Sequence, residues 1–167
     1  MYPVICRIGP FEIYSFGVMV AAAALLCSFL MVREGKSFGI KAQEIYDLVF
    51  WAAVGGIIGA RVFYIFLNFS FFLSSPAEIF MINHGGLAWQ GGFVFGILAV
   101  VVFIRLKKRP LLVMADFIAP YLALAQAVGR SGCFLNGCCY GKEFVGGVYF
   151  PVHDAVLHPT QLYESAL

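Results

Sequence analysis

Residues 48–67 read LVFWAAVGGIIGARVFYIFL, and this stretch decides the fold class of the chain. A helix rises about 1.5 Å per residue, so a run of roughly 20 residues is long enough to cross the hydrocarbon core of a bilayer. Arg61 is the only charged residue in the run. Inside lipid a single segment satisfies its own backbone hydrogen bonds only as a helix. The run therefore predicts a transmembrane helix.

Three further apolar runs have the same character, at residues 14–32, 85–104 and 111–128. Hydrophobic residues make up 62% of the 167 residues, charged residues only 12%, and the mean hydropathy is +0.90. A soluble domain is about 45–50% apolar. We predict an all-α polytopic transmembrane helical bundle that forms a single domain over residues 1–167. An interfacial segment should cover residues 68–83, a long outer-face loop should follow the fourth span, and another span should start near residue 159.

Charge predicts orientation and excludes one class of partner. Seven of the eleven Lys and Arg residues lie in the two connections at residues 33–41 and 105–109, which indicates that these connections are cytoplasmic. The N-terminus and the segment after residue 128 then lie outside. The net charge of +2 provides no basic surface for nucleic acid, so no nucleic-acid partner is expected.

Small residues recur four positions apart in the second and third runs, and this spacing predicts close helix packing. The pairs are Gly55 with Gly59, Gly56 with Ala60, and Gly92 with Gly96.

The densest group of chemically useful residues is GRSGCFLNGCCYG at residues 129–141. Glycine lets backbone amides approach a ligand, and Arg130 supplies a guanidinium fork suited to phosphate. The pattern predicts an anion-binding loop, with a simple glycine-rich turn as the alternative. Arg61 is a second candidate, because a charge inside a span is functional, paired, or extended toward the interface.

Other side chains suggest metal or acid–base chemistry. Cys133, Cys138 and Cys139 do not follow the two-pair spacing of structural zinc sites, which favours free thiols or a disulfide. No metal and no cofactor are expected. His84, His153 and His158 all fall on the predicted outer side, where each is either a general base or an ordinary hydrogen-bonding loop residue.

Three motifs, taken together, resemble the prolipoprotein diacylglyceryl transferase family in matching order. They are GGLAWQGG at 85–92, GRSG at 129–132 and HPTQLYE at 158–164, and shorter matches occur at residues 8–10, 59–61 and 116–120. The resemblance covers nearly the whole chain. It implies an enzyme of the bacterial plasma (inner) membrane that moves a diacylglyceryl group from phosphatidylglycerol to the lipobox cysteine of a prolipoprotein signal peptide. Its partners would be these two substrates and the surrounding membrane lipids.

The resemblance also implies site residues. Arg130 would bind the lipid head group and stabilise the leaving phosphate, with Arg61 as an inner cation. The remaining binding positions would be Asn136, Gly137, Gly141, Tyr163 and Glu164. The candidates for catalysis are Arg130, Gln90 and His158.

Four departures from the family pattern keep other functions open. Gln90 replaces the family's usual histidine, and an amide does not accept a proton at neutral pH. Cys133 and Cys138 stand where Asn and an acidic residue are usual, and Leu167 ends the sequence where further spans, one with another functional arginine, are expected. The alternatives are a non-catalytic or altered-chemistry membrane protein that binds anionic phospholipid, and a thiol-based activity of the three cysteines.

Overall fold

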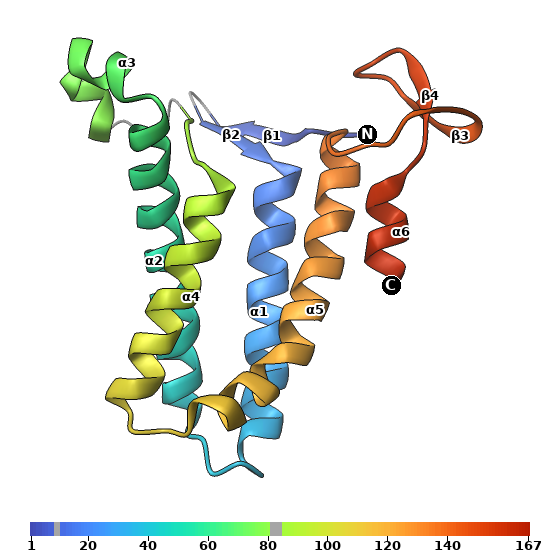
Figure 1. Ribbon diagram of the computed structural model, residues 1–167. Coiled ribbons are helices and arrows are strands. Elements are labelled where there is room, and N and C mark those ends of the chain that lie inside the picture. Colours follow the sequence, from blue (N-terminus) through green and yellow to red (C-terminus); the bar gives the residue numbers. More distant parts are fainter. Residues whose placement is uncertain (9–10, 81–84) are drawn as a thin grey trace. The chain divides into compact units, whose positions relative to one another are not determined.

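The computed structural model describes residues 1–8, 11–80 and 85–167. Four of its helices are long and apolar enough to cross a membrane, which confirms the polytopic helical fold (Figure 1). They are α1 (Ser15–Gly35), α2 (Ala42–Leu67), α4 (Trp89–Leu106) and α5 (Leu111–Asn136). By their contacts the residues form two compact units, one of residues 35–117 and one of residues 1–34 with 118–167.

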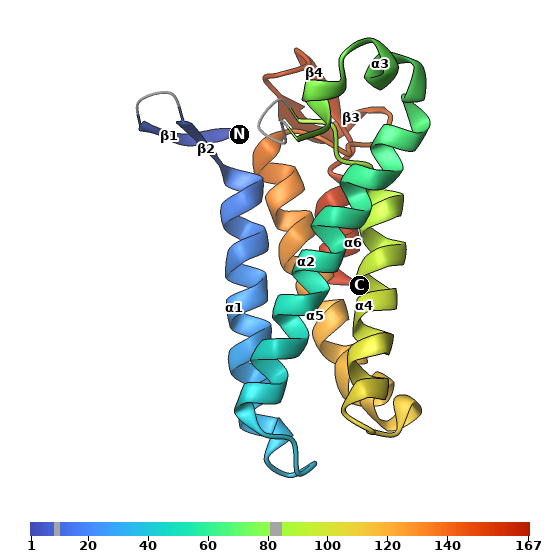
Figure 2. The same ribbon diagram turned by 90° about the vertical axis from the view of Figure 1, so that its left-hand side faces the viewer.

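In the unit of residues 35–117, helices α2 and α4 lie side by side along their length (Figures 1 and 2). The small residues of both helices form the contact. A Cβ on Gly59 would lie 2.7 Å from the carbonyl oxygen of Gly91, and a Cβ on Gly91 would lie 2.3 Å from that of Gly59. The predicted close packing of these two runs is confirmed.

Two short helices belong to the connection between α2 and α4, in the segment that the sequence assigns to the interface. They are α3 (Phe69–Ser74) and the 3-10 helix η1 (Pro76–Phe80). Phe72 of α3 is buried and contacts the Tyr64 ring of α2 edge-on, with the ring centroids 6.1 Å apart. This contact anchors the connection to the end of α2.

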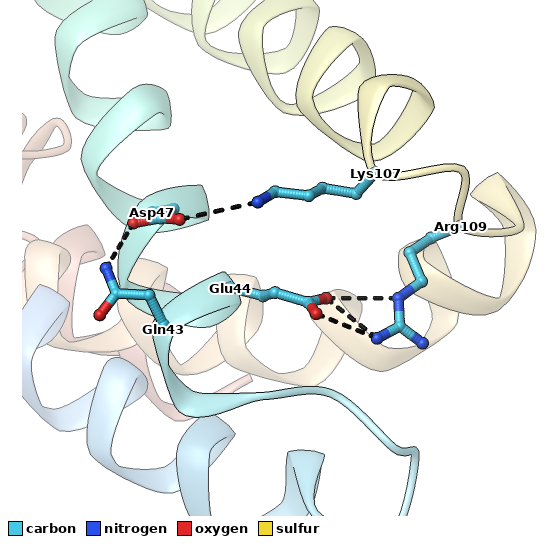
Figure 3. Close-up of polar contacts among 5 residues, drawn as sticks. All are labelled: Gln43, Glu44, Asp47, Lys107 and Arg109. Atoms are coloured by element: carbon cyan, nitrogen blue, oxygen red, sulfur yellow. Dashed lines mark hydrogen bonds and ion pairs between the residues drawn. The ribbon is translucent and has the colours of Figure 1, made fainter.

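The opposite end of the same unit is held by charged residues (Figure 3). Arg109, between α4 and α5, donates Nη2 to Glu44 Oε2 at 3.0 Å and to the carbonyl oxygen of Gly39 at 2.9 Å. Lys107 lies 3.9 Å from Asp47. Glu44 is in the first turn of α2, where a carboxylate also complements the helix dipole. These pairs fasten the start of α2 to the connection between α4 and α5.

The other unit contains two antiparallel hairpins that the sequence analysis did not predict. Strand β1 (Val4–Ile8) pairs with β2 (Phe11–Tyr14), and β3 (Glu143–Phe150) pairs with β4 (Ala155–Leu157). Helix α6 (Thr160–Ala166) follows β4. Strands β1, β2 and β4 have only three to five residues, and the eight residues of β3, EFVGGVYF, do not alternate between polar and apolar side chains, although most of them favour strands.

Helices α1 and α5 meet in this unit through a thiol and a glycine. Cys27 donates its S–H to the carbonyl oxygen of Tyr121 at 3.3 Å. A Cβ on Gly132 would lie 2.8 Å from Cβ of Met19, so the glycine permits the close approach.

Candidate functional site

Arg130 lies on a helix, which corrects the prediction of an anion-binding loop from residue 129 onward. Helix α5 continues to Asn136, so the GRSG motif forms part of its last turns. The glycine content misled the sequence analysis because glycine favours loops. Here Gly132 serves the contact with Met19. The guanidinium is therefore presented from a rigid helical backbone.

The Arg130 side chain has one anionic partner and a buried donor without a partner. Its Nη2 lies 2.5 Å from Oε2 of Glu164 on α6, and 27% of the side chain is exposed. Within the described residues, its Nε is buried and has no hydrogen-bond partner. A buried N–H without a partner is costly, so an incoming oxygen acceptor would gain by binding there.

Helix α5 ends in a Schellman cap at Gly137. The Gly137 N–H donates to Phe134 O and the Cys138 N–H donates to Cys133 O, each at 3.1 Å. Gly137 has a φ of +75°, a conformation that other residues adopt at a cost. Asn136 is the last residue of α5 and is half-buried.

The segment after this cap folds back onto α6. Gly141 N–H donates to the carbonyl oxygen of His158 at 2.9 Å, and a Cβ on Gly141 would lie 2.8 Å from both His158 Cβ and Thr160 Cγ2. The His158 ring stacks on Phe144 with a centroid distance of 4.2 Å, and its Nδ1 lies 3.2 Å from the Tyr163 hydroxyl. Fold-back thus brings Gly141, His158 and Tyr163 together.

Two residues of α6 hold the turn at Cys138 and Cys139 in place, and neither was predicted as a site residue. Gln161 is fully buried and donates Nε2 to the carbonyl oxygen of Cys138. Thr160 donates its hydroxyl to the carbonyl oxygen of Cys139 at 2.8 Å. Both residues lie within the HPTQLYE motif at 158–164, but the motif alone did not assign them a role.

The charge of Arg130 reaches this turn. Partial burial and the neighbouring Cys138 raise the pKa of the Cys139 thiol above its usual value, and a hydrogen bond with Cys133 and the charge of Arg130 offset only part of this increase. Cys139 itself has a φ of +62°.

Arg61 lies in the other unit and binds backbone oxygens. Arg61 is only 7% exposed. Its guanidinium donates hydrogen bonds to four carbonyl oxygens, those of Ile79 at 3.2 Å, Gly85 at 2.7 Å, Gly86 at 2.9 Å, and Glu78. Together with aromatic side chains of α2 and α3 it lines a cavity of about 280 Å³. In this arrangement the arginine holds the connection between α2 and α4.

Three candidates remain, namely Gln90, His153 and His84. Gln90 is exposed in the first turn of α4. His153 is exposed, with Nε2 3.1 Å from the carbonyl oxygen of Gly137. His84 lies outside the described residues.

Comparison with known proteins identifies relatives across nearly all of the chain. Residues 3–167 match the sequence model of the prolipoprotein diacylglyceryl transferase family. Proteins called phosphatidylglycerol–prolipoprotein diacylglyceryl transferase from Lactiplantibacillus plantarum and Staphylococcus carnosus are each 33% identical over 175 residues. These alignments cover 98% of this chain and 62% and 64% of the relatives. A protein of the same name from Listeria innocua is 34% identical, with 98% of this chain and 63% of the relative covered. The chain thus spans somewhat less than two thirds of the curated relatives it matches.

Proposed function

The chain belongs to the prolipoprotein diacylglyceryl transferase family, and from this we propose that the full-length protein transfers a diacylglyceryl group from phosphatidylglycerol to a prolipoprotein. The acceptor is the thiol of the lipobox cysteine in the signal peptide, and the second product is glycerol phosphate. Relatives over 98% of the chain carry the names of these two substrates.

The observation that carries the proposal is the state of Arg130. Its guanidinium is held on one side by Glu164, while Nε on the same fork is buried without a partner in the described part of the chain. A phosphate oxygen supplies the missing acceptor and forms a charge-assisted hydrogen bond with the guanidinium. Arg130 therefore binds the lipid head group, and Glu164 sets the orientation of the guanidinium.

The contact between Arg130 and the phosphate also stabilises the transition state of the transfer. The acceptor sulfur forms a bond to the glycerol carbon, the bond from that carbon to the phosphate oxygen breaks, and glycerol phosphate leaves with the electron pair. Negative charge grows on the leaving oxygen in the transition state, and a preorganised cation beside that oxygen lowers the barrier.

The thiol proton needs an acceptor, because the thiolate is the nucleophile. Gln90 cannot serve, whereas His158 has a suitable hydrogen-bond arrangement. When its Nδ1–H donates to the Tyr163 hydroxyl, Nε2 carries a lone pair, and no described residue forms a hydrogen bond with Nε2. We assign His158 as the base and Tyr163 as the residue that orients it. Replacing His158 with Gln should lower kcat/KM for transfer, because glutamine does not accept the thiol proton.

The proposal includes a location. The cation-rich connections at residues 33–41 and 105–109 favour the cytoplasmic side of a bacterial plasma (inner) membrane, with the N-terminus outside. Arg130, at the far end of α5 from the second of these connections, then lies at the outer surface, where prolipoproteins and outer-leaflet phosphatidylglycerol are accessible.

The test is a transfer assay with labelled phosphatidylglycerol vesicles and a lipobox peptide, on the full-length protein that contains this sequence. Arg130→Ala should lower kcat/KM by about 10²–10³, the loss typical of one charge-stabilising donor. Arg7→Ala is the matched control, because the Arg7 side chain is 72% exposed and pairs with Glu12 in the same unit. Transfer by Arg130→Ala at the wild-type rate would refute the assignment.

Gln90 favours a second candidate function, the binding of anionic phospholipid without transfer. In that case the peptide stays unmodified in the same assay, while the protein still binds phosphatidylglycerol vesicles in an Arg130-dependent manner.

A further inference from the structure

Three cysteine thiols converge beside the cap of α5. The Sγ atoms of Cys133, Cys138 and Cys139 all lie within 4.8 Å of one another, and those of Cys138 and Cys139 are 3.7 Å apart. All three are free thiols. We propose that they bind one thiophilic divalent metal ion, Zn²⁺, as three thiolate ligands, with water in the fourth position.

The helix cap itself brings the first two ligands together. In a Schellman motif the side chain three positions before the C-cap residue frequently contacts the side chain two positions after it. Cys133 and Cys138 occupy these positions, as the hydrogen bond from Cys138 N–H to Cys133 O at 3.1 Å defines. Gly137, with its positive φ, makes the reversal between them possible. The two thiols thus face each other as a direct result of how α5 ends.

The third ligand is held by α6. The backbone at Cys139 has a φ of +62°, an uncommon value for a side chain other than glycine or asparagine. The carbonyl oxygens of Cys138 and Cys139 are bound by Gln161 and Thr160. These side-chain hydrogen bonds keep the turn in one conformation, so the thiols are positioned before a metal arrives.

The spacing of the sulfurs fits a zinc site. Zn–S bonds of about 2.3 Å place two sulfurs of a tetrahedral site about 3.8 Å apart. The distance of 3.7 Å between Cys138 and Cys139 already meets this requirement, and the limit of 4.8 Å leaves at most about 1 Å to be closed by side-chain rotation. Three protein ligands with one open position are the pattern of zinc sites that hold water or substrate.

Charge also fits. Three thiolates and Zn²⁺ carry a net charge of −1, and Arg130 lies one helical turn before Cys133 on α5. The spacing C-x₄-C-C predicts no metal site, because it lacks the two separated pairs of structural zinc sites. The three ligands come together only because α5 ends in a cap at Gly137 and because α6 holds the turn at Cys138 and Cys139.

The test is a Co²⁺ titration of the full-length protein in detergent, after reduction and removal of bound metal. We expect one equivalent of Co²⁺ to produce sulfur-to-cobalt charge-transfer absorption and tetrahedral d–d bands, which Zn²⁺ should abolish. Serine at any of Cys133, Cys138 or Cys139 should weaken binding more than about tenfold, since even changes outside the ligand sphere cost that much. Cys6→Ser, an exposed thiol on β1, is the matched control and should bind as the wild type does.

A second measurement uses the wild-type chain and does not depend on the folding of variants. Zn²⁺ should protect Cys133, Cys138 and Cys139 from alkylation, as read by mass spectrometry of peptides, and should leave Cys6 reactive. The proposal is wrong if the reduced protein shows neither Co²⁺ bands nor protection. It is also wrong if the bands persist in all three serine variants. A Cys133–Cys138 disulfide in the isolated protein, with no metal binding after reduction, would instead identify a thiol–disulfide pair.

Discussion

Packing between α2 and α4 can be tested by a single added methyl group. In Gly59→Ala the new Cβ would lie 2.2 Å from Phe95 Cβ and 2.7 Å from the carbonyl oxygen of Gly91, so the helices must separate. In Gly56→Ala the new Cβ would meet only the carbonyl oxygen of Gly92, at 3.6 Å, an ordinary contact. Both glycines lie inside α2, so the gain in helix propensity, about 1 kcal/mol, cancels in the comparison. The difference is the steric cost, which we expect to be about 1–3 kcal/mol.

The assay is reversible unfolding in mixed micelles with increasing SDS, followed by tryptophan fluorescence. The two tryptophans, Trp51 on α2 and Trp89 on α4, both report on this unit. Gly56→Ala should unfold at or above the wild-type SDS fraction, and Gly59→Ala clearly below it. Equal midpoints for the two variants would contradict the close contact of the backbones at Gly59 and Gly91.

Three further changes test other contacts. Arg109→Ala and Glu44→Gln, combined in a double-mutant cycle with the same fluorescence assay, should show a coupling of about 1 kcal/mol, and additive effects would mean that the pair contributes no stability. Gly137→Ala should cost about 1–2 kcal/mol because of its positive φ and should speed hydrogen exchange at residues 133–141, whereas Gly129→Ala, with open space around its Cβ, should not. Arg61→Lys should destabilise the unit by about 1–3 kcal/mol because one ammonium cannot reach all four carbonyl oxygens; an unchanged unfolding midpoint would show that these bonds are dispensable.

The two arginines illustrate why a sequence motif predicts a site better than it predicts the conformation of that site. The sequence analysis identified Arg130 by its glycine-rich surroundings and expected a loop. In the structure Gly132 allows α5 to approach Met19, and the helix continues beyond the arginine. Arg61 was expected to serve a ligand, and its proposed role in substrate binding stays a prediction. Its visible partners are carbonyl oxygens of the connection between α2 and α4.

Predictions from local pattern succeeded where a single segment decides its own structure. Apolar length determined the four long helices, and the four-residue spacing of glycine and alanine determined where α2 and α4 make contact. The two hairpins were missed because three of their strands have at most five residues and the fourth, β3, does not alternate between polar and apolar residues, so their pairing depends on the partner strand. Gln161 was missed because nothing in a sequence shows that an amide will meet the carbonyl oxygen of a residue on another element.

By itself the sequence determined that the chain resides in lipid, that four apolar segments become long helices, and to which family the chain belongs, because hydrophobic length and motif order are properties of the chain. The tertiary structure alone decided that Arg130 pairs with Glu164 while keeping a donor unused, and that three cysteines become neighbours. Both results depend on the reversal at Gly137 and on the return of α6 to the end of α5. Distances between residues far apart in sequence follow from how the elements pack, and no local pattern contains that information.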